Sequence, residues 1–86
     1  NQMKTTLIVE RTNHNENLSP IKTEKARKEF DKWIPAISYR SDYINKIRAE
    51  YGDIEVFPEQ TIGDASVIHV VVERGNKTAD YKLSCI

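Results

Sequence analysis

The last third of the chain contains two runs in which apolar and polar residues alternate, and a Gly75-Asn76 pair separates them. Alternation with a period of two is typical of a strand with one buried face, and a glycine–asparagine pair suits the two-residue turn of a β-hairpin. If Arg74 pairs with Lys77, one hairpin face becomes almost entirely apolar, with the cross-strand pairs Val72/Ala79, Val70/Tyr81, Ile68/Leu83 and Ser66/Cys85. This agreement predicts strands over 66–74 and 77–85 in that register, because a slip of one residue would turn the apolar set outward.

The other face of the predicted hairpin is mixed and carries the side chains most suited to chemistry. Its cross-strand pairs are Glu73/Thr78, Val71/Asp80, His69/Lys82 and Val67/Ser84. Because Cys85 points into the core and His69 points away from it, the two cannot form a thiolate–imidazole pair. We expect Cys85 to be a small buried residue and His69 to be a polar residue on a half-solvated strand.

The middle of the chain predicts two helices. Ser19-Pro20 suits a helix start, and Pro35 should end or kink this first helix because it lacks a backbone N–H donor. A second helix is predicted from Ser41 to Gly52, a residue suited to the position just after a helix. The apolar residues that recur at helical spacing, and that should cover the sheet, are Ala26, Phe30, Trp33, Ile34, Ile37, Ile44 and Ile47.

Two more strands are predicted, over residues 4–12 and 54–62, since both are rich in β-branched or apolar residues. Pro58 suggests that the strand over 54–62 lies at an edge of the sheet. The facing of this strand stays open. A two-residue turn at Gly63-Asp64 turns Phe57 toward the core, and a three-residue turn directs it away.

The predicted order of elements is therefore β-α-α-β-β-β, in a single α+β domain over residues 1–86. We expect a four-stranded antiparallel-type sheet with two helices on one face, as is typical when strands and helices are segregated. The pattern leaves open the position of the first strand in the sheet. Met3 suits a native start, so Asn1 and Gln2 are expected to be additions to the natural sequence.

The composition argues against several classes of function. The 86 residues include 13 basic and 13 acidic ones, and a net charge of zero does not suit a nonspecific nucleic-acid coat or a membrane-surface protein. One cysteine cannot form an internal disulfide and suits a reducing compartment. No run approaches the roughly 18 apolar residues that span a bilayer, and no signal-peptide pattern occurs, so we expect a cytoplasmic protein. The glycosylation sequons at Asn17 and Asn76 are then coincidental.

Motifs for catalysis, metal or cofactor binding are absent from the sequence. The two histidines, His14 and His69, fall in different predicted elements, and no Cys/His spacing resembles a zinc site. The three glycines are assigned to turns or a helix end, which leaves none for a phosphate-binding loop. We therefore expect no enzyme, metal or cofactor. A ribonuclease with His69, Lys82 and Arg74 on its sheet face is a third alternative, because small ribosome-dependent mRNA-cleaving toxins have a similar β-α-α-β-β-β order.

The segment KWIPAISYRSDY, residues 32–43, is the strongest candidate for a binding surface. Tryptophan, tyrosine and arginine dominate interface hot spots. We expect the proline break to expose a cluster at the junction of the helices, made of Trp33, Tyr39, Arg40 and Tyr43. The alternative for Trp33 and Tyr43 is a place in the core, because both fall on apolar helical stripes.

Two other surfaces are weighed against this one. Residues 21–50 carry eight basic and five acidic side chains, so the same aromatic residues could stack on bases while lysines and arginines meet phosphates. This nucleic-acid-binding domain is the alternative function. The mixed sheet face offers a second interface, for a partner or for a homodimer, made of Val67, His69, Val71 and Lys82.

The function that the sequence predicts is binding of another protein, as an inhibitor or adaptor. The small size and the Ile/Lys/Asn-rich composition suit a phage or mobile-element product. The identity of the partner and the oligomeric state do not follow from the residues.

Overall fold

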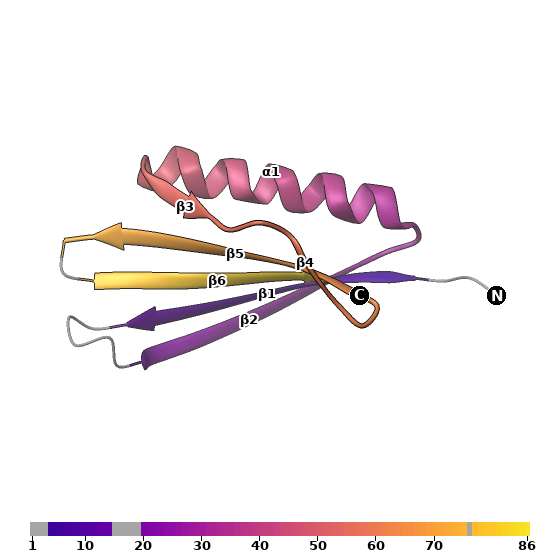
Figure 1. The fold of residues 1–86 in the computed structure, drawn as a ribbon, viewed down its shortest axis with the longest axis horizontal. Helices are drawn as coiled ribbons and strands as arrows, with labels where there is room; N and C mark the ends of the chain where they lie inside the picture. The colour runs from indigo at the N-terminus through magenta and orange to yellow at the C-terminus, as the bar shows by residue number, and fades with distance from the viewer. Residues whose placement is uncertain (1–3, 15–19, 76) are drawn as a thin grey trace.

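One antiparallel sheet and one helix make up the fold, in a computed structural model that describes residues 4–14, 20–75 and 77–86 (Figure 1). The sheet has the strand order β2-β1-β6-β5-β3, and β4 also pairs with β5. The helix α1 lies across one face of this sheet (Figure 1). The elements are β1 (Thr5–His14), β2 (Pro20–Phe30), α1 (Trp33–Tyr51), β3 (Ile54–Val56), β4 (Gln60–Ile62), β5 (Ala65–Arg74) and β6 (Lys77–Cys85).

The predicted four-stranded sheet with two helices is therefore wrong, chiefly because residues 20–30 form β2 and not a helix. The lysines, glutamates, arginine and alanine of this segment favour a helix locally. Antiparallel pairing with β1, in which Val9 lies opposite Ala26 and Thr5 opposite Phe30, overrides that preference. Residues 22–29 are all exposed, as is common for a charged edge strand that resists pairing with another chain.

The helix α1 is continuous through Pro35, so the predicted break between two helices is also wrong. Pro35 is the third residue of α1, where a backbone N–H has no partner inside the helix, and its missing donor costs little. The predicted end is confirmed: the N–H of Gly52, at φ 80°, donates to the carbonyl of Arg48 at 2.8 Å. The single helix turns Ala36, Ile44 and Ile47 toward the sheet, which places Ile34 on its outer side. Ile34 is 78% exposed, so the prediction that it belongs to the core is wrong.

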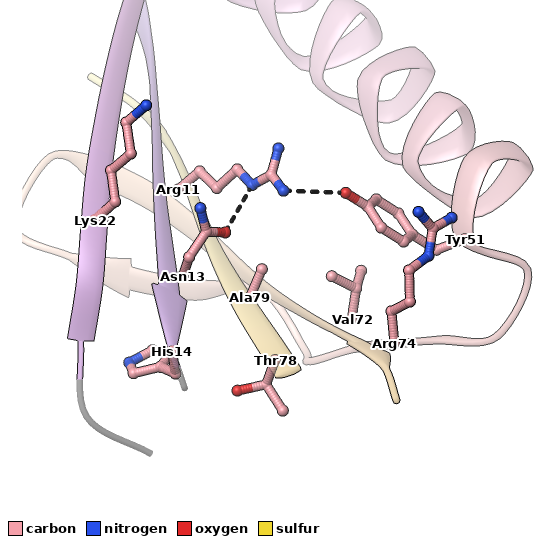
Figure 2. A pocket seen from close by; sticks show the side chains of 9 residues that line it. All are labelled: Arg11, Asn13, His14, Lys22, Tyr51, Val72, Arg74, Thr78 and Ala79. Atoms are coloured by element: carbon pink, nitrogen blue, oxygen red, sulfur yellow. Dashed lines mark hydrogen bonds between the residues drawn. The ribbon is translucent and has the colours of Figure 1, made fainter. Parts of the chain in front are cut away.

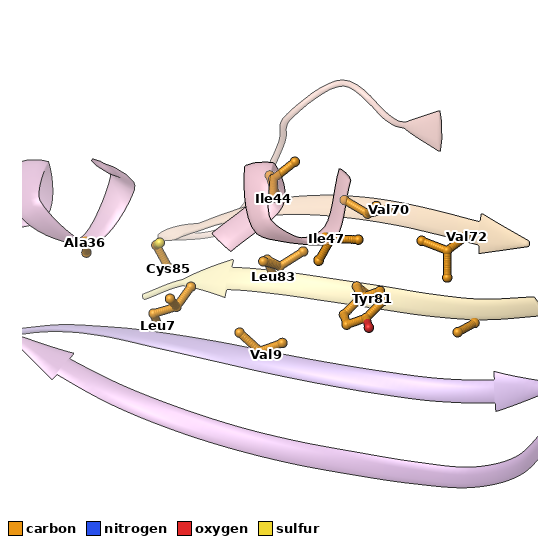
Figure 3. Close-up of a cluster of buried hydrophobic side chains, with 11 residues drawn as sticks. Leu7, Val9, Ala36, Ile44, Ile47, Val70, Val72, Tyr81, Leu83 and Cys85 are labelled. Carbon is orange, nitrogen blue, oxygen red and sulfur yellow. The ribbon is translucent and has the colours of Figure 1, made fainter. Parts of the chain in front are cut away.

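The predicted register of the last hairpin is confirmed in every pair, from Arg74 opposite Lys77 to Ser66 opposite Cys85. Its apolar face packs under α1, and β1 adds two residues to the same layer (Figure 3). The side chains of Val70, Leu83 and Cys85 are completely buried. The core between sheet and helix consists of Leu7, Val9, Ala36, Ile44, Ile47, Val70, Val72, Ala79, Tyr81, Leu83 and Cys85.

The predicted strand over 54–62 is split into β3 and β4 around Pro58, and both lie at the β5 edge of the sheet, as the proline indicated. The two-residue turn at Gly63-Asp64 is present, since Ile62 pairs with Ala65. That register does not continue into β3, where the pairing with β5 is offset by one residue. Although the turn has two residues, Phe57 therefore does not enter the core: it is 42% exposed at the edge, and its N–H donates to the carbonyl of His69 at 2.9 Å.

Within the described ranges, no helix is both long enough and apolar enough to cross a membrane. Asn1, Gln2 and the sequon asparagines Asn17 and Asn76 lie outside the described residues.

Candidate functional site

The four residues predicted to bind a partner all lie on α1, but they do not form one exposed cluster. Trp33 is 41% exposed at the start of the helix, and Tyr39 is 36% exposed two turns later. Tyr43 is half-buried against the core. Arg40 is almost completely buried, so the prediction that a helix junction exposes it is wrong.

Arg40 instead ties α1 to the β4–β5 edge. Its Nη1 donates to the carbonyl oxygen of Ser66 at 2.8 Å, and its Nη2 donates to Ser66 Oγ at 3.0 Å and to Glu59 Oε2 at 3.0 Å. Ser66 Oγ also donates to the same Glu59 oxygen. The hydrogen bond from Ser66, and then the one from Arg40, lower the pKa of the Glu59 carboxyl below its ordinary value. These contacts give Arg40 a structural role.

A groove runs between α1 and β2, because the single helix covers the middle of the sheet and not its β2 edge. Two adjoining cavities of about 190 and 270 Å³, which share Val9, Ala26 and Tyr43, form it. We call this the α1–β2 groove; its lining residues are Leu7, Val9, Arg11, Glu24, Lys25, Ala26, Arg27, Lys28, Tyr39, Tyr43 and Tyr81.

Tyrosines and basic side chains meet along the α1–β2 groove. The Tyr39 ring lies 5.4 Å from the ring of Phe30, and Lys28 Nζ lies 4.4 Å from the centre of the Tyr39 ring. Arg11 Cζ lies 5.5 Å from the centre of the Tyr81 ring. Burial raises the pKa of both Tyr43 and Tyr81, so these hydroxyls keep their protons at neutral pH and can donate hydrogen bonds.

At the end of the groove, beyond the carboxyl end of α1, lies a cavity of about 360 Å³ (Figure 2). Its floor is apolar, because Val72 and Ala79 are buried there. Its walls are basic and polar. We call this cavity the basic pocket; the wall residues are Arg11, Asn13, His14, Lys22, Tyr51, Arg74 and Thr78.

Two arginines from different strands converge on Tyr51 in the basic pocket (Figure 2). Arg11 Nη2 donates to the Tyr51 hydroxyl at 3.2 Å, and Arg11 Nε donates to Asn13 Oδ1 at 3.1 Å. Arg74 Cζ lies 5.1 Å from the centre of the Tyr51 ring. These contacts with neutral groups hold the guanidinium groups in place without neutralising their charge.

The other two basic residues of the pocket have acidic neighbours. Lys22 Nζ lies 3.1 Å from Glu24 Oε1, and His14 Nδ1 lies 3.8 Å from Asp80 Oδ2. Among the described residues, no carboxylate forms an ion pair with Arg11 or Arg74.

The mixed sheet face, proposed above as a second interface, is the face without the helix. His69 lies opposite Lys82 there and Val71 opposite Asp80, as the register predicted. Val67 is only 3% exposed, although the helix does not cover it, so it offers little surface to a partner.

The three residues of the ribonuclease alternative are not brought together. His69 and Lys82 lie on the helix-free face, whereas Arg74 packs on Tyr51 on the helix side. The order of elements that this alternative needed is also replaced by β-β-α-β-β-β-β. Cys85 is buried in the core, and burial raises the pKa of its thiol.

The helix-free face also carries acidic residues near β3. Glu55 lies there opposite Val71, and a cavity of about 510 Å³ is lined by Asp53, Glu55 and Glu73. No group of three His, Cys, Asp or Glu within the described ranges could hold a metal ion. The net charge of the chain is zero, but basic residues gather around the basic pocket and acidic residues gather around this second cavity.

Sequence reasoning missed the basic side of the site because it assigned residues 20–34 to a helix. On a strand, the alternation Lys22, Glu24, Ala26, Lys28, Phe30 puts these side chains on one face, beside the register partners Arg11 and Val9. That period-two pattern was the available signal. Comparison of the chain with models of protein families, with curated proteins and with solved structures gave no match.

Proposed function

We propose that the domain binds an extended acidic segment of a partner protein in the α1–β2 groove, and acts as an adaptor or inhibitor by holding that segment. The supporting observation is that α1 leaves the helix side of β2 uncovered, so that tyrosines face basic side chains across an open channel. Tyrosine and arginine, which both line the groove, are enriched among the residues that carry most of the binding energy at protein interfaces.

The charge in the groove sets the chemistry of the partner. Glu24 is the only acidic residue among the described residues that line it, and its carboxylate already pairs with Lys22. Lys28 has no carboxylate partner within the described ranges and lies over Tyr39. An acidic segment would therefore meet positive charge that no carboxylate neutralises. Such charge complementarity speeds the association of the two partners and fixes how the segment is aligned in the groove.

The shape of the groove favours an extended chain over a folded surface. Residues of α1 line the channel on one side and residues of β2 on the other, and residues of β1 and β6 line it between them. Trp33 lies outside the residues that line the groove, at the start of α1. As the single tryptophan of the chain, it serves as a fluorescence reporter.

Selection from a displayed library of random peptides tests this proposal. We expect the folded domain to enrich acidic peptides, and we expect Lys28→Glu and Tyr39→Ser to weaken their binding by about tenfold or more, equivalent to about 1.4 kcal/mol. Lys46→Glu is the matched control, because Lys46 is exposed on α1 and does not line the groove. It should change binding by less than about twofold.

Two results would contradict the proposal. One is that no acidic peptides are enriched, or that Lys46→Glu weakens their binding as much as Lys28→Glu does. The other is that the domain binds single-stranded oligonucleotides in preference to peptides. In that case log K should fall linearly with log salt, by about 0.7 per phosphate contact, which would assign the groove to nucleic acid.

A further inference from the structure

We infer that the basic pocket is a binding site for a single oxyanion group, a phosphate or a carboxylate, held between Arg11 and Arg74. This inference does not depend on the occupant proposed for the α1–β2 groove. It rests on the charge, the geometry and the enclosure of the pocket.

The two arginines of the pocket, Arg11 and Arg74, have no carboxylate ion pair within the described ranges. Arg11 and Arg74 come from β1 and β5, which β6 separates, and both contact Tyr51. Two like charges held near one neutral ring repel each other, and a bound anion relieves that repulsion. Glu24 is the cross-strand partner of Arg11, but its carboxylate lies 3.1 Å from Lys22 and forms no ion pair with Arg11.

The geometry of Arg11 is fixed before any ligand arrives. Its guanidinium is held by Asn13, by the Tyr51 hydroxyl and by the ring of Tyr81. These contacts use two of the five guanidinium N–H donors, which leaves donors for the paired oxygens of a phosphate or carboxylate. A side chain that is already ordered loses less conformational entropy when a ligand binds, so the affinity for an anion is higher.

The enclosure of the pocket strengthens these interactions. Its buried floor of Val72 and Ala79 keeps water away from one side, and hydrogen bonds to charged groups are stronger where the local dielectric constant is low. Its volume of about 360 Å³ falls in the range of small-ligand sites.

Titration of the full chain with inorganic phosphate and, separately, with succinate tests the site by nuclear magnetic resonance. The side-chain Nε–H signals of the arginines report on the pocket, and the ionic strength is kept constant to remove general screening. We expect saturable shifts at Arg11 and Arg74 with at least one probe. Phosphate alone, succinate alone or both probes would each support the site and would identify the class of oxyanion that it takes.

Charge-removing variants separate a built site from a general effect of positive charge. Arg11→Gln and Arg74→Gln should each raise the dissociation constant about fivefold or more, because each removes charge-assisted hydrogen bonds to the anion. Arg48→Gln removes the same charge at an exposed position of α1 that lines neither the basic pocket nor the α1–β2 groove, and it should change the dissociation constant by less than about twofold. Arg74 is exposed, so its replacement is compatible with folding even if that of Arg11 is not.

The inference is overturned if neither probe gives saturable shifts at the two arginines. It is equally overturned if Arg48→Gln weakens anion binding as much as Arg74→Gln does, since that result would show attraction to overall charge and not to the basic pocket.

Discussion

Replacement of Arg40 by methionine tests whether this residue holds the fold together or is available to a partner. Methionine keeps a long apolar stem but removes three hydrogen bonds, two to Ser66 and one to Glu59. The two buried hydrogen bonds to Ser66 come from a charged group, for which about 1.5–3 kcal/mol each is typical, and the Ser66 carbonyl would lose a buried donor. Relief of the desolvation penalty of the guanidinium offsets part of that loss.

We therefore expect Arg40→Met to lower the free energy of unfolding by about 2–4 kcal/mol, a large share of the roughly 5–15 kcal/mol typical of small domains. The side chain of Glu59 is 54% exposed, so its ion pair with Arg40 is screened by water and adds little. Glu59→Gln is thus the matched variant, with a smaller loss expected.

Urea denaturation followed by the fluorescence of Trp33 measures both variants. A loss below about 0.5 kcal/mol for Arg40→Met would refute the structural role, because that value is typical of exposed positions. Equal losses for the two variants would show that the exposed ion pair, and not the buried contacts with Ser66, carries the effect.

Two other predictions concern the core and the pH dependence of stability. Leu83→Ala should cost about 2–5 kcal/mol in urea denaturation, because the side chain is completely buried, whereas Ile34→Ala, at a position 78% exposed, should cost less than about 0.5 kcal/mol. Folding lowers the pKa of the Glu59 carboxyl below its ordinary value of 4.5. The ionised carboxylate therefore stabilises the fold above pH 4.5, and this stabilisation is lost as the pH falls through the pKa that the group has in the folded protein. The melting temperature of the wild type should therefore fall more steeply below about pH 5 than that of Glu59→Gln; parallel curves would contradict the role of this carboxylate.

The parts of the fold that were predicted correctly are those whose signals lie close together in the chain. The register of β5 and β6 follows from one turn and from alternation on either side of it, and both are local patterns. Gly52 marks the end of α1 because only a residue that tolerates positive φ fits there. The strand β1 was found from its β-branched residues in the same way.

The candidate site could not be predicted because its members come together only through long-range pairing. Arg11, Tyr51 and Arg74 belong to three elements, and no spacing in the sequence connects them. Arg40 was expected on the surface because a proline was expected to break the helix. The position of Pro35 in the first turn, where it removes no helical hydrogen bond, reverses that expectation.

The sequence by itself determined the C-terminal hairpin, the end of α1 and the apolar layer of β5 and β6, since a period of two, a turn and a glycine act over a few residues. Tertiary structure decided the state of residues 20–30, which favour a helix locally but pair along the whole of β1. The hydrogen bonds of that ladder are made with the preceding strand β1, so the helix propensity of residues 20–30 taken alone does not register them. The same pairing carries Lys22 and Lys28 to the helix side of the sheet, where the groove and the basic pocket form.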